Sequence, residues 1–304
     1  MFGPFAAAVT VGKLMALPRE QLQSAIALAA NFSCGLLEAS KTGFMEWRFQ
    51  NGVALRNGIM AAWLAQKGLS GAPTTLEGEC GFFASFGGPE LRSEILSVKE
   101  SIIATLGKQF YVAQNMFKPY ASCAYNQIGV EVALRMMKEH GIQPEEVERI
   151  DIVVAPENKN YPGVDFQGPF ETIDQAVLSK AFSVATAMKH GNLTVDMYLS
   201  DLQDPGVLGV AKKVFTDDEK GMGFFDTRVV FRLKNGTVFT GDQGLADMGN
   251  YSLEGNRIVD KFCRLTSNRL EENKAKEVVA SIFNLPEMST VSEFSKILRN
   301  AFVK

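Results

Sequence analysis

The chain is poor in the residues that metal sites and disulfide frameworks need. Its 304 residues include four cysteines and two histidines, and no two cysteines form a C-x-x-C pair. A zinc site is therefore not predicted, and we expect neither a metal nor another cofactor. Cys34 and Cys263 stand among apolar neighbours, which predicts that both are buried.

Long apolar runs and basic stripes are also absent. No uninterrupted apolar stretch approaches the ~20 residues that a membrane-spanning helix needs. The 31 basic residues are scattered and the formal charge is −3, so the sequence gives no reason to expect a nucleic-acid partner. The N-terminus lacks the charged region of a signal peptide. We therefore expect a cytoplasmic protein without membrane or nucleic-acid partners.

Apolar residues make up 46% of the chain, enough for a large core and two domains. Helical spacing of Ala, Leu and Met predicts helices at residues 5–17, 20–32 and 52–67, whereas residues 77–88 are expected to form a loop. Strands are predicted at residues 149–154 and 228–233, and Asn235-Gly236 predicts a hairpin from the second strand to residues 237–240.

Two helices are predicted between these strands, at residues 176–190 and 205–215. His140 and His190 each precede a glycine at an expected helix end, where a histidine complements the helix dipole. From residue 253 the pattern is helical again, with Pro286 as a break. The predicted fold is mainly α: a helical body, residues 1–111 and 248–304, carries a smaller α+β lid domain, residues 112–247.

Residues 116–127 form the best candidate site. Lys118, two tyrosines, Ser122, Cys123 and two amides precede an amphipathic helix, and Pro119 keeps the segment out of that helix. A lysine beside a helix N-terminus can bind a carboxylate, or lose its proton if it is desolvated. The alternative is an ordinary loop before a helix, with a surface lysine.

Residues 117–127 resemble the Lys-Pro-Tyr-Pro-Ser-Cys-x-Tyr-Thr-His segment of the 2-methylcitrate dehydratase (MmgE/PrpD) family, which includes cis-aconitate decarboxylases and iminodisuccinate epimerases. Further segments follow in the family's order: the Phe-Gly start of the first helix, and residues 33–38, 52–58 and 76–86. The resemblance implies a helical domain with a smaller lid. It also implies a substrate site between the two, of the kind that commonly lies between domains.

The resemblance implies a role for each matching residue. Arg48 would clamp a substrate carboxylate, although an ion pair is an equal alternative. Lys118 would be a base or a carboxylate anchor. The proposed site residues form two sets, one catalytic and one substrate-binding. The catalytic set is Lys118, Tyr120, Cys123 and Tyr125; the substrate-binding set is Arg48, Gln50, Asn51, Ser122, Asn126, Gln127 and Ser179.

Several positions depart from the family pattern. Trp47 stands where a lysine is common, Gln50-Asn51 replace a histidine segment, and Asn126-Gln127 replace Thr-His. In Ser179-Lys180-Ala181-Phe182 the phenol of the Ser-x-x-Tyr pattern is missing. The chain thus keeps anion-binding residues and loses much of the proton-transfer equipment.

The resemblance begins at the first predicted helix of this chain. In other members of the family, a substantial helical portion precedes that helix. Three explanations are open: a second chain supplies that half, the protein is a reduced relative, or the chain is a fragment. Because residues 5–17 are apolar on most of their circumference, we expect a homo-oligomer, such as a dimer, or a hetero-oligomer with a chain that supplies the N-terminal half.

These observations predict a cofactor-independent lyase or isomerase that acts on a small di- or tricarboxylic acid by proton abstraction next to a carboxylate. Dehydration, decarboxylation and epimerisation all remain open. The competing prediction is a non-catalytic subunit that binds a polycarboxylate or serves a structural role.

Overall fold

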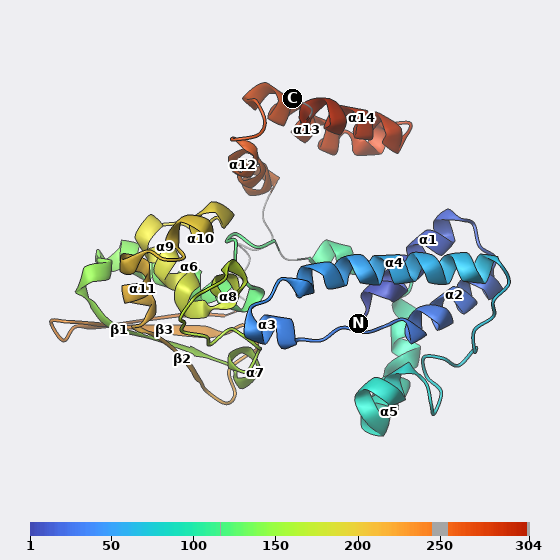
Figure 1. The fold of residues 1–304 in the computed structure, drawn as a ribbon, viewed down its shortest axis with the longest axis horizontal. Coiled ribbons are helices and arrows are strands. Elements are labelled where there is room, and N and C mark those ends of the chain that lie inside the picture. The colour runs from blue at the N-terminus through green and yellow to red at the C-terminus, as the bar shows by residue number, and fades with distance from the viewer. Residues whose placement is uncertain (116, 245–254, 303–304) are drawn as a thin grey trace.

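The computed structural model describes residues 1–115, 117–244 and 255–302. The described chain forms three groups of elements (Figure 1): N-terminal helices, a lid built on a β-sheet, and three C-terminal helices. This arrangement confirms a mainly helical protein with a small α+β region. The division into one helical domain and one lid stays a prediction.

The N-terminal group packs α1 (Gly3–Leu14), α2 (Arg19–Asn31) and α4 (Glu46–Gln66) against one another. Its core consists of small side chains, which lets the helix axes come close; the fully buried alanines include Ala8, Ala25, Ala29, Ala61 and Ala62. At Gly58 of α4, a Cβ atom would lie 2.4 Å from the Cβ of Ala7. Glycine is therefore required at this helix contact.

The helix α5 (Phe82–Thr105) corrects the expectation of a loop over residues 77–88. Only residues up to Gly81 precede the helix, and Phe82 packs in edge-to-face contact with Phe5 at 5.0 Å. The sequence hides this helix because Gly88 and Pro89 interrupt its pattern; Gly88 has a φ of +76° and kinks the helix.

The lid contains a four-stranded sheet in the order β2-β1-β3-β4. The strand β1 (Val147–Val154) pairs in parallel with β2 (Val214–Asp218) and antiparallel with β3 (Thr227–Leu233), which turns into β4 (Val238–Gln243). The hairpin prediction at Asn235-Gly236 is confirmed, with Gly236 at a φ of +84°. The expected helix at 205–215 is wrong at its end, because α11 (Pro205–Ala211) stops before β2.

Helices cover one face of this sheet (Figure 1). The main layer consists of α6 (Gln127–His140) and α9 (Lys180–His190), with α10 (Val195–Asp201) and α11 beside them. Alternate residues of β3 are buried beneath them, as expected for a sheet with one covered face. His140 and His190 each end a helix before a left-handed glycine, as predicted. Shorter elements complete the lid: η2 (Ala124–Asn126), η3 (Pro144–Glu146), α7 (Pro156–Lys159) and α8 (Ile173–Leu178).

The short helix α3 (Glu38–Thr42) packs on α8 of the lid, although it precedes α4 in the chain. The Thr172 hydroxyl donates to the carbonyl of Gly43 at 2.8 Å, and the Gln175 amide donates to the carbonyl of Thr42 at 3.3 Å. The segment that links α2 to α4 is therefore docked on the lid.

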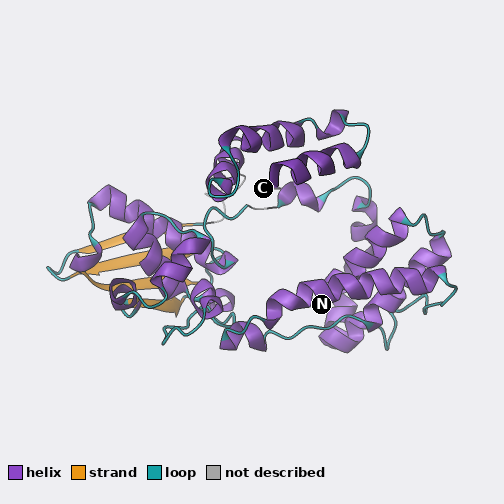
Figure 2. Cartoon of the chain, turned by 45° about the horizontal axis from the view of Figure 1, so that its top comes forward, coloured by secondary structure: helices purple, strands orange, loops and turns teal. Residues whose placement is uncertain are grey.

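The C-terminal helices α12 (Gly255–Thr266), α13 (Glu272–Phe283) and α14 (Val291–Phe302) have a small core of their own around Leu270 and Val278. Figure 2 shows them as a separate layer. A 3₁₀ turn, η5 (Leu285–Glu287), contains Pro286, as expected for a helix break. Among the described helices, even the longest lack the apolar composition needed to cross a bilayer.

Two of the cysteine expectations can be compared with this fold. Cys34 is exposed, so the prediction of its burial is wrong: it lies in the irregular segment after α2, outside the alanine core. Cys263 is partly buried on α12, where it packs against the C-terminal core.

Candidate functional site

The loop ahead of α6 is shaped by the side chain of Gln127, the first residue of that helix. Its Oε1 accepts from the backbone N–H of Tyr120 at 3.1 Å, and its Nε2 donates to the carbonyls of Tyr120, Ser122 and Cys123. This one side chain satisfies four backbone groups of the loop. The predicted role of Gln127 in substrate binding stays untested, and its position makes it the frame of the loop.

A buried polar network fixes the same loop to α8 and α9. The Ser122 hydroxyl lies 2.7 Å from that of Ser183, and the Asn126 amide donates to the carbonyl of Leu178 at 2.8 Å. Asn126 is fully buried, and its Oδ1 has no hydrogen-bond partner within the described chain. These groups hold the loop rigidly, and their predicted contact with substrate is likewise untested.

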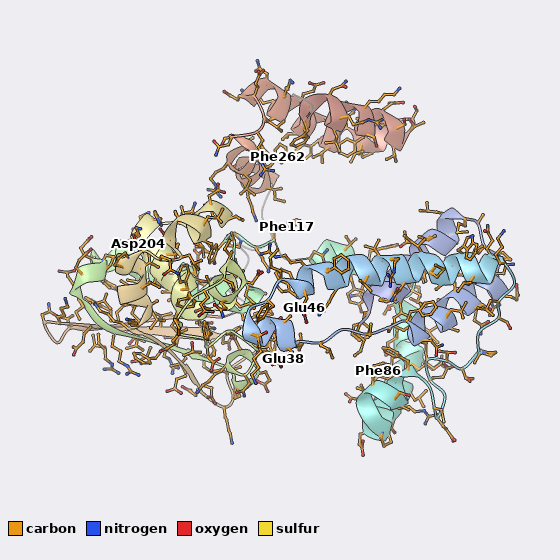
Figure 3. The ribbon with its side chains drawn as sticks, in the orientation of Figure 1. Glu38, Glu46, Phe86, Phe117, Asp204 and Phe262 are labelled. Atoms are coloured by element: carbon orange, nitrogen blue, oxygen red, sulfur yellow. The ribbon has the colours of Figure 1, made fainter. Side chains whose placement is uncertain are left out.

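Lys118 is exposed at the start of the loop, and its ammonium donates to the carbonyl of Ser122 at 3.2 Å. Lys261 of α12 donates to the backbone carbonyl of Lys118. Burial, and then the charges of Arg264 and Lys118, lower the pKa of Lys261. Figure 3 places Phe117 on the side of the lid toward Phe262, the neighbour of Lys261. Two lysines from distant segments thus meet here, and sequence reasoning missed Lys261.

No salt bridge connects Lys118 or Lys261 to a carboxylate in the part of the chain that the structure describes. The acid nearest to the loop in the hydrogen-bond network is Glu131, which accepts from the Tyr120 hydroxyl at 2.7 Å. The predicted donor Tyr120 therefore already has a carboxylate partner. The two lysines form a local excess of positive charge suited to an anion.

Cys123 and Tyr125 lie partly buried on the same loop. The Tyr125 ring lies 4.4 Å from that of Tyr161 and 5.6 Å from that of Phe224, measured between centroids. Burial raises the pKa of the Cys123 thiol, and the charges of Lys118 and Lys180 oppose this effect. Burial also raises the pKa of Tyr125 and of Tyr161. These groups are thus protonated donors near neutral pH.

Lys180 is a fully buried lysine beside this loop that sequence reasoning did not single out. It is fully buried at the first position of α9, where Ser179 caps the helix by accepting from the N–H of Phe182. Its amine donates to the carbonyl of Tyr125 and to Oδ1 of Asn158, both at 2.9 Å. Desolvation lowers the pKa of Lys180 to about 7. The available signal was that Lys180 is the one charged residue between Asp174 and Lys189.

Arg48 pairs with Asp174 of α8 rather than standing free. Its Nη2 and Nε donate to the same Oδ1 of Asp174 at 2.8 and 3.1 Å, and the Trp47 indole donates to that oxygen at 3.0 Å. Asp174 is buried, whereas the Arg48 side chain is 47% exposed. Arg48 therefore forms an ion pair in this structure, and its proposed contact with substrate stays a prediction.

The remaining predicted residues occupy different surroundings. The Gln50 amide donates to the carbonyl of Leu36 at 3.0 Å and lines a cavity of about 240 Å³ with Cys34 and Phe49. Asn51 is exposed. The Ser179 hydroxyl donates to the carbonyl of Phe166 at 2.6 Å. Phe182, at the position of the missing phenol, is fully buried between Phe170 and Tyr198.

Metal-ligating side chains do not cluster in the described structure: no three His, Cys, Asp or Glu residues gather where an ion could be held. A larger cavity of about 620 Å³ opens elsewhere on the lid, between α6, α9 and α11. It is lined by Lys189, Lys213 and Asp204 among others, and does not include the loop of Lys118.

Comparison with known families bears directly on this arrangement. Residues 1–94 match the MmgE/PrpD N-terminal domain and residues 120–285 match the MmgE/PrpD C-terminal domain. The chain belongs to the MmgE/PrpD family. The second match begins at Tyr120, so Lys118 lies at the end of the segment, residues 95–119, that separates the two matches.

Relatives in this family include cis-aconitate decarboxylase from Aspergillus terreus, which is 22% identical over 315 residues. The cis-aconitate decarboxylase-like protein oryM from Aspergillus oryzae is 20% identical over 308 residues. Each alignment covers 98% of this chain but only 63% and 64% of the relative. The chain thus spans somewhat under two thirds of the length of these relatives.

Proposed function

We propose that this protein acts on a small di- or tricarboxylic acid by removing a proton next to a carboxylate, as a lyase or an isomerase without a cofactor. The observation that carries the proposal is the meeting of Lys118 and Lys261 without an acidic partner among the described residues. The Lys261 ammonium can bind one carboxylate of a ligand, which leaves Lys118 to bind a second carboxylate or to act as the base. The relatives named cis-aconitate decarboxylase support the same class of substrate.

In this proposal each group around the loop has a separate task. Lys261 binds one carboxylate, and Lys118, when neutral, accepts the proton from the adjacent carbon. Tyr125 and Cys123, both protonated near neutral pH, supply a proton to the developing enediolate or to the product. The rigid frame made by Gln127 and Asn126 keeps these groups in place.

The test is deuterium exchange from heavy water into methylcitrate, citrate, cis-aconitate and iminodisuccinate, followed by NMR. Exchange detects proton abstraction even when no net product forms. Lys118→Ala should abolish exchange. Lys118→Arg should keep binding and lose exchange if Lys118 is the base, because an arginine does not deprotonate near neutral pH. Lys138→Ala, an exposed lysine at the other end of α6, is the matched control.

A second candidate is a non-catalytic subunit that binds a polycarboxylate. It is favoured by the internal hydrogen bonds of Trp47, Asn126 and Gln127, which give these three departures from the family pattern structural tasks. Calorimetric binding of one of the four acids without proton exchange would establish this alternative. Exchange abolished by Lys118→Ala would exclude it.

Either form of the proposal includes self-association or a partner chain. The exposed face of α4 carries Leu55, Ile59 and Trp63 at four-residue spacing, each between 47% and 57% exposed. This apolar stripe is typical of a helix that packs against another chain or segment.

A further inference from the structure

The lid carries a cavity of about 620 Å³ whose lining does not include the loop of Lys118. Residues from the last turn of α6, the second half of α9 and α11 line it, together with the segment around η3. Pockets of about 300–1,000 Å³ are the usual size of small-molecule sites in proteins. The proposed function leaves this cavity without a role.

Much of the lining is apolar and belongs to the main core of the lid. Ala185, Met188 and Val207 are buried members of that core, and all three line the cavity. Met137 and Val210 also line it, and they pack against the same core while remaining partly exposed. Methionine side chains adapt to ligands of varied shape because they are unbranched and polarizable. This part of the lining suits the apolar body of a ligand.

Two lysines, Lys213 and Lys234, line the cavity from one end of the sheet. The Lys213 ammonium donates to the carbonyl of Val147, the first residue of β1, at 2.6 Å. Val147 pairs in register with Leu233, the last residue of β3, and Lys234 follows it directly in the chain. The backbone N–H of Lys234 donates to the carbonyl of Glu146 at 2.9 Å. These two residues, the corner lysines, therefore approach the cavity at the same corner of the sheet.

The charged side chains of the lining leave an excess of unpaired positive charge. Lys189 already has two carboxylate partners, Asp201 at 3.1 Å and Asp204 at 2.9 Å. Neither corner lysine forms an ion pair with a carboxylate among the residues that the structure describes. Glu145 is the one lining acid without an ion pair in that same part of the chain. Two unpaired cations against one unpaired acid favour an anionic ligand.

We propose that this cavity is a second binding site, for a small organic anion that has one carboxylate and a longer apolar body. The carboxylate binds at the corner lysines, and the apolar body lies against Met188 and Val207. The proposal does not rest on the proposed function, since it uses none of the residues around Lys118. The ligand also differs from the di- and tricarboxylic acids proposed there, because those acids have no long apolar body.

The first experiment uses octanoate as the probe, with octanol and octylamine as neutral and cationic controls of the same chain length. In protein with ¹³C-methyl methionine, octanoate should shift the NMR signals of Met137 and Met188 with a Kd of about 0.1–1 mM. The two controls should bind more weakly by a factor of about three or more. The signal of Met45, an exposed methionine just before α4, should not move. No shift at Met188, an equal shift at Met45, or equal affinity for octylamine would overturn the proposal.

A charge variant tests the role of the corner lysines. Lys234 is exposed, so Lys234→Gln should leave the fold intact. It should weaken octanoate binding by a factor of about three and leave octanol binding unchanged, because only the carboxylate interacts with the ammonium. Lys212→Gln, at an exposed lysine outside the lining, is the matched control and should change neither affinity.

A space variant tests the cavity itself. Gly209 of α11 lines the cavity, and a Cβ atom built on it meets no atom within 4 Å. Gly209→Phe therefore should fold normally, fill part of the cavity and weaken octanoate binding by a factor of about ten. Gly209→Ala is the matched control and should keep the affinity. Unchanged octanoate affinity in folded Lys234→Gln or in folded Gly209→Phe would overturn the proposal.

Discussion

Arg48 of α4 and Asp174 of α8 form an ion pair of 2.8 Å between residues that lie 126 positions apart. The Trp47 indole donates to the same carboxylate oxygen, and the Arg48 guanidinium lies 5.4 Å from the Trp47 ring. This contact ties the first turn of α4 to the lid.

A double-mutant cycle on Arg48→Ala and Asp174→Ala should give a coupling free energy of about 1 kcal/mol in urea unfolding, since Asp174 is buried and Arg48 is half exposed. The exposed pair Lys276–Glu272 of α13 serves as a control and should couple more weakly. Equal coupling at the two sites would show that the pair contributes nothing beyond a surface contact.

The stability of the protein should depend on Lys180 between pH 7 and 10.5. In this window the unfolded chain binds a proton that the folded chain does not, because the folded pKa is about 7 and the ordinary value is 10.5. The free energy of unfolding of wild type, relative to Lys180→Met, should therefore rise by roughly 2–3 kcal/mol from pH 7 to pH 9. Below pH 7 the difference should be constant. Urea titrations of both proteins at pH 6, 7, 8 and 9 measure it, and a flat difference would contradict a buried neutral lysine.

Two glycine-to-alanine changes in helices should have opposite effects on stability. In α6, Gly129→Ala meets only ordinary contacts at 3.7 Å and beyond, so it should raise the free energy of unfolding by roughly 0.5 kcal/mol. In α4, Gly58→Ala would place Cβ 2.5 Å from the carbonyl oxygen of Pro4 and 2.8 Å from the amide of Ala8. It should cost about 2–3 kcal/mol. Thermal unfolding of the two variants side by side tests the helix contact, and equal stability would argue against it.

Association should depend on the apolar face of α4. We expect wild type to form an oligomer whose interface exceeds ~2,000 Å² in total. Ile59→Glu together with Trp63→Glu should shift it toward the monomer in light scattering. Val238→Glu, at an equally exposed apolar residue on β4, should leave the mass unchanged. A wild-type monomer in dilute solution would refute the prediction.

The parts of this fold that the sequence predicts are those with local causes. The alanine-rich helices, the Asn235-Gly236 hairpin and the helix ends at His140 and His190 follow from side-chain spacing and from glycine geometry. The strand β2 is missed because it is short and follows α11 almost directly. Its partner β1 lies some sixty residues earlier, so pairing depends on non-local contacts that no spacing reveals.

The candidate site likewise has a part that the sequence predicts from local causes and a part that depends on non-local contacts. The loop of Lys118 is recognisable because its polar residues are consecutive and precede a clear helix. Lys261 and Asp174 are not recognisable, since each meets its partner across more than a hundred residues. Lys180 stands out in the sequence as the one charged residue between Asp174 and Lys189, but only its packing beside Gly129 of α6 shows that it is a buried amine.

The contact of Arg48 with the lid also has a mechanical consequence. The helix α4 has 21 residues and therefore measures about 30 Å; its first turn is bonded to α8, while its later turns pack on α1 and α2. An α-helix of this length behaves as a rod. Any rotation of the lid must then either break the bond to Asp174 or turn the far end of the rod, and with it the packing of the N-terminal helices.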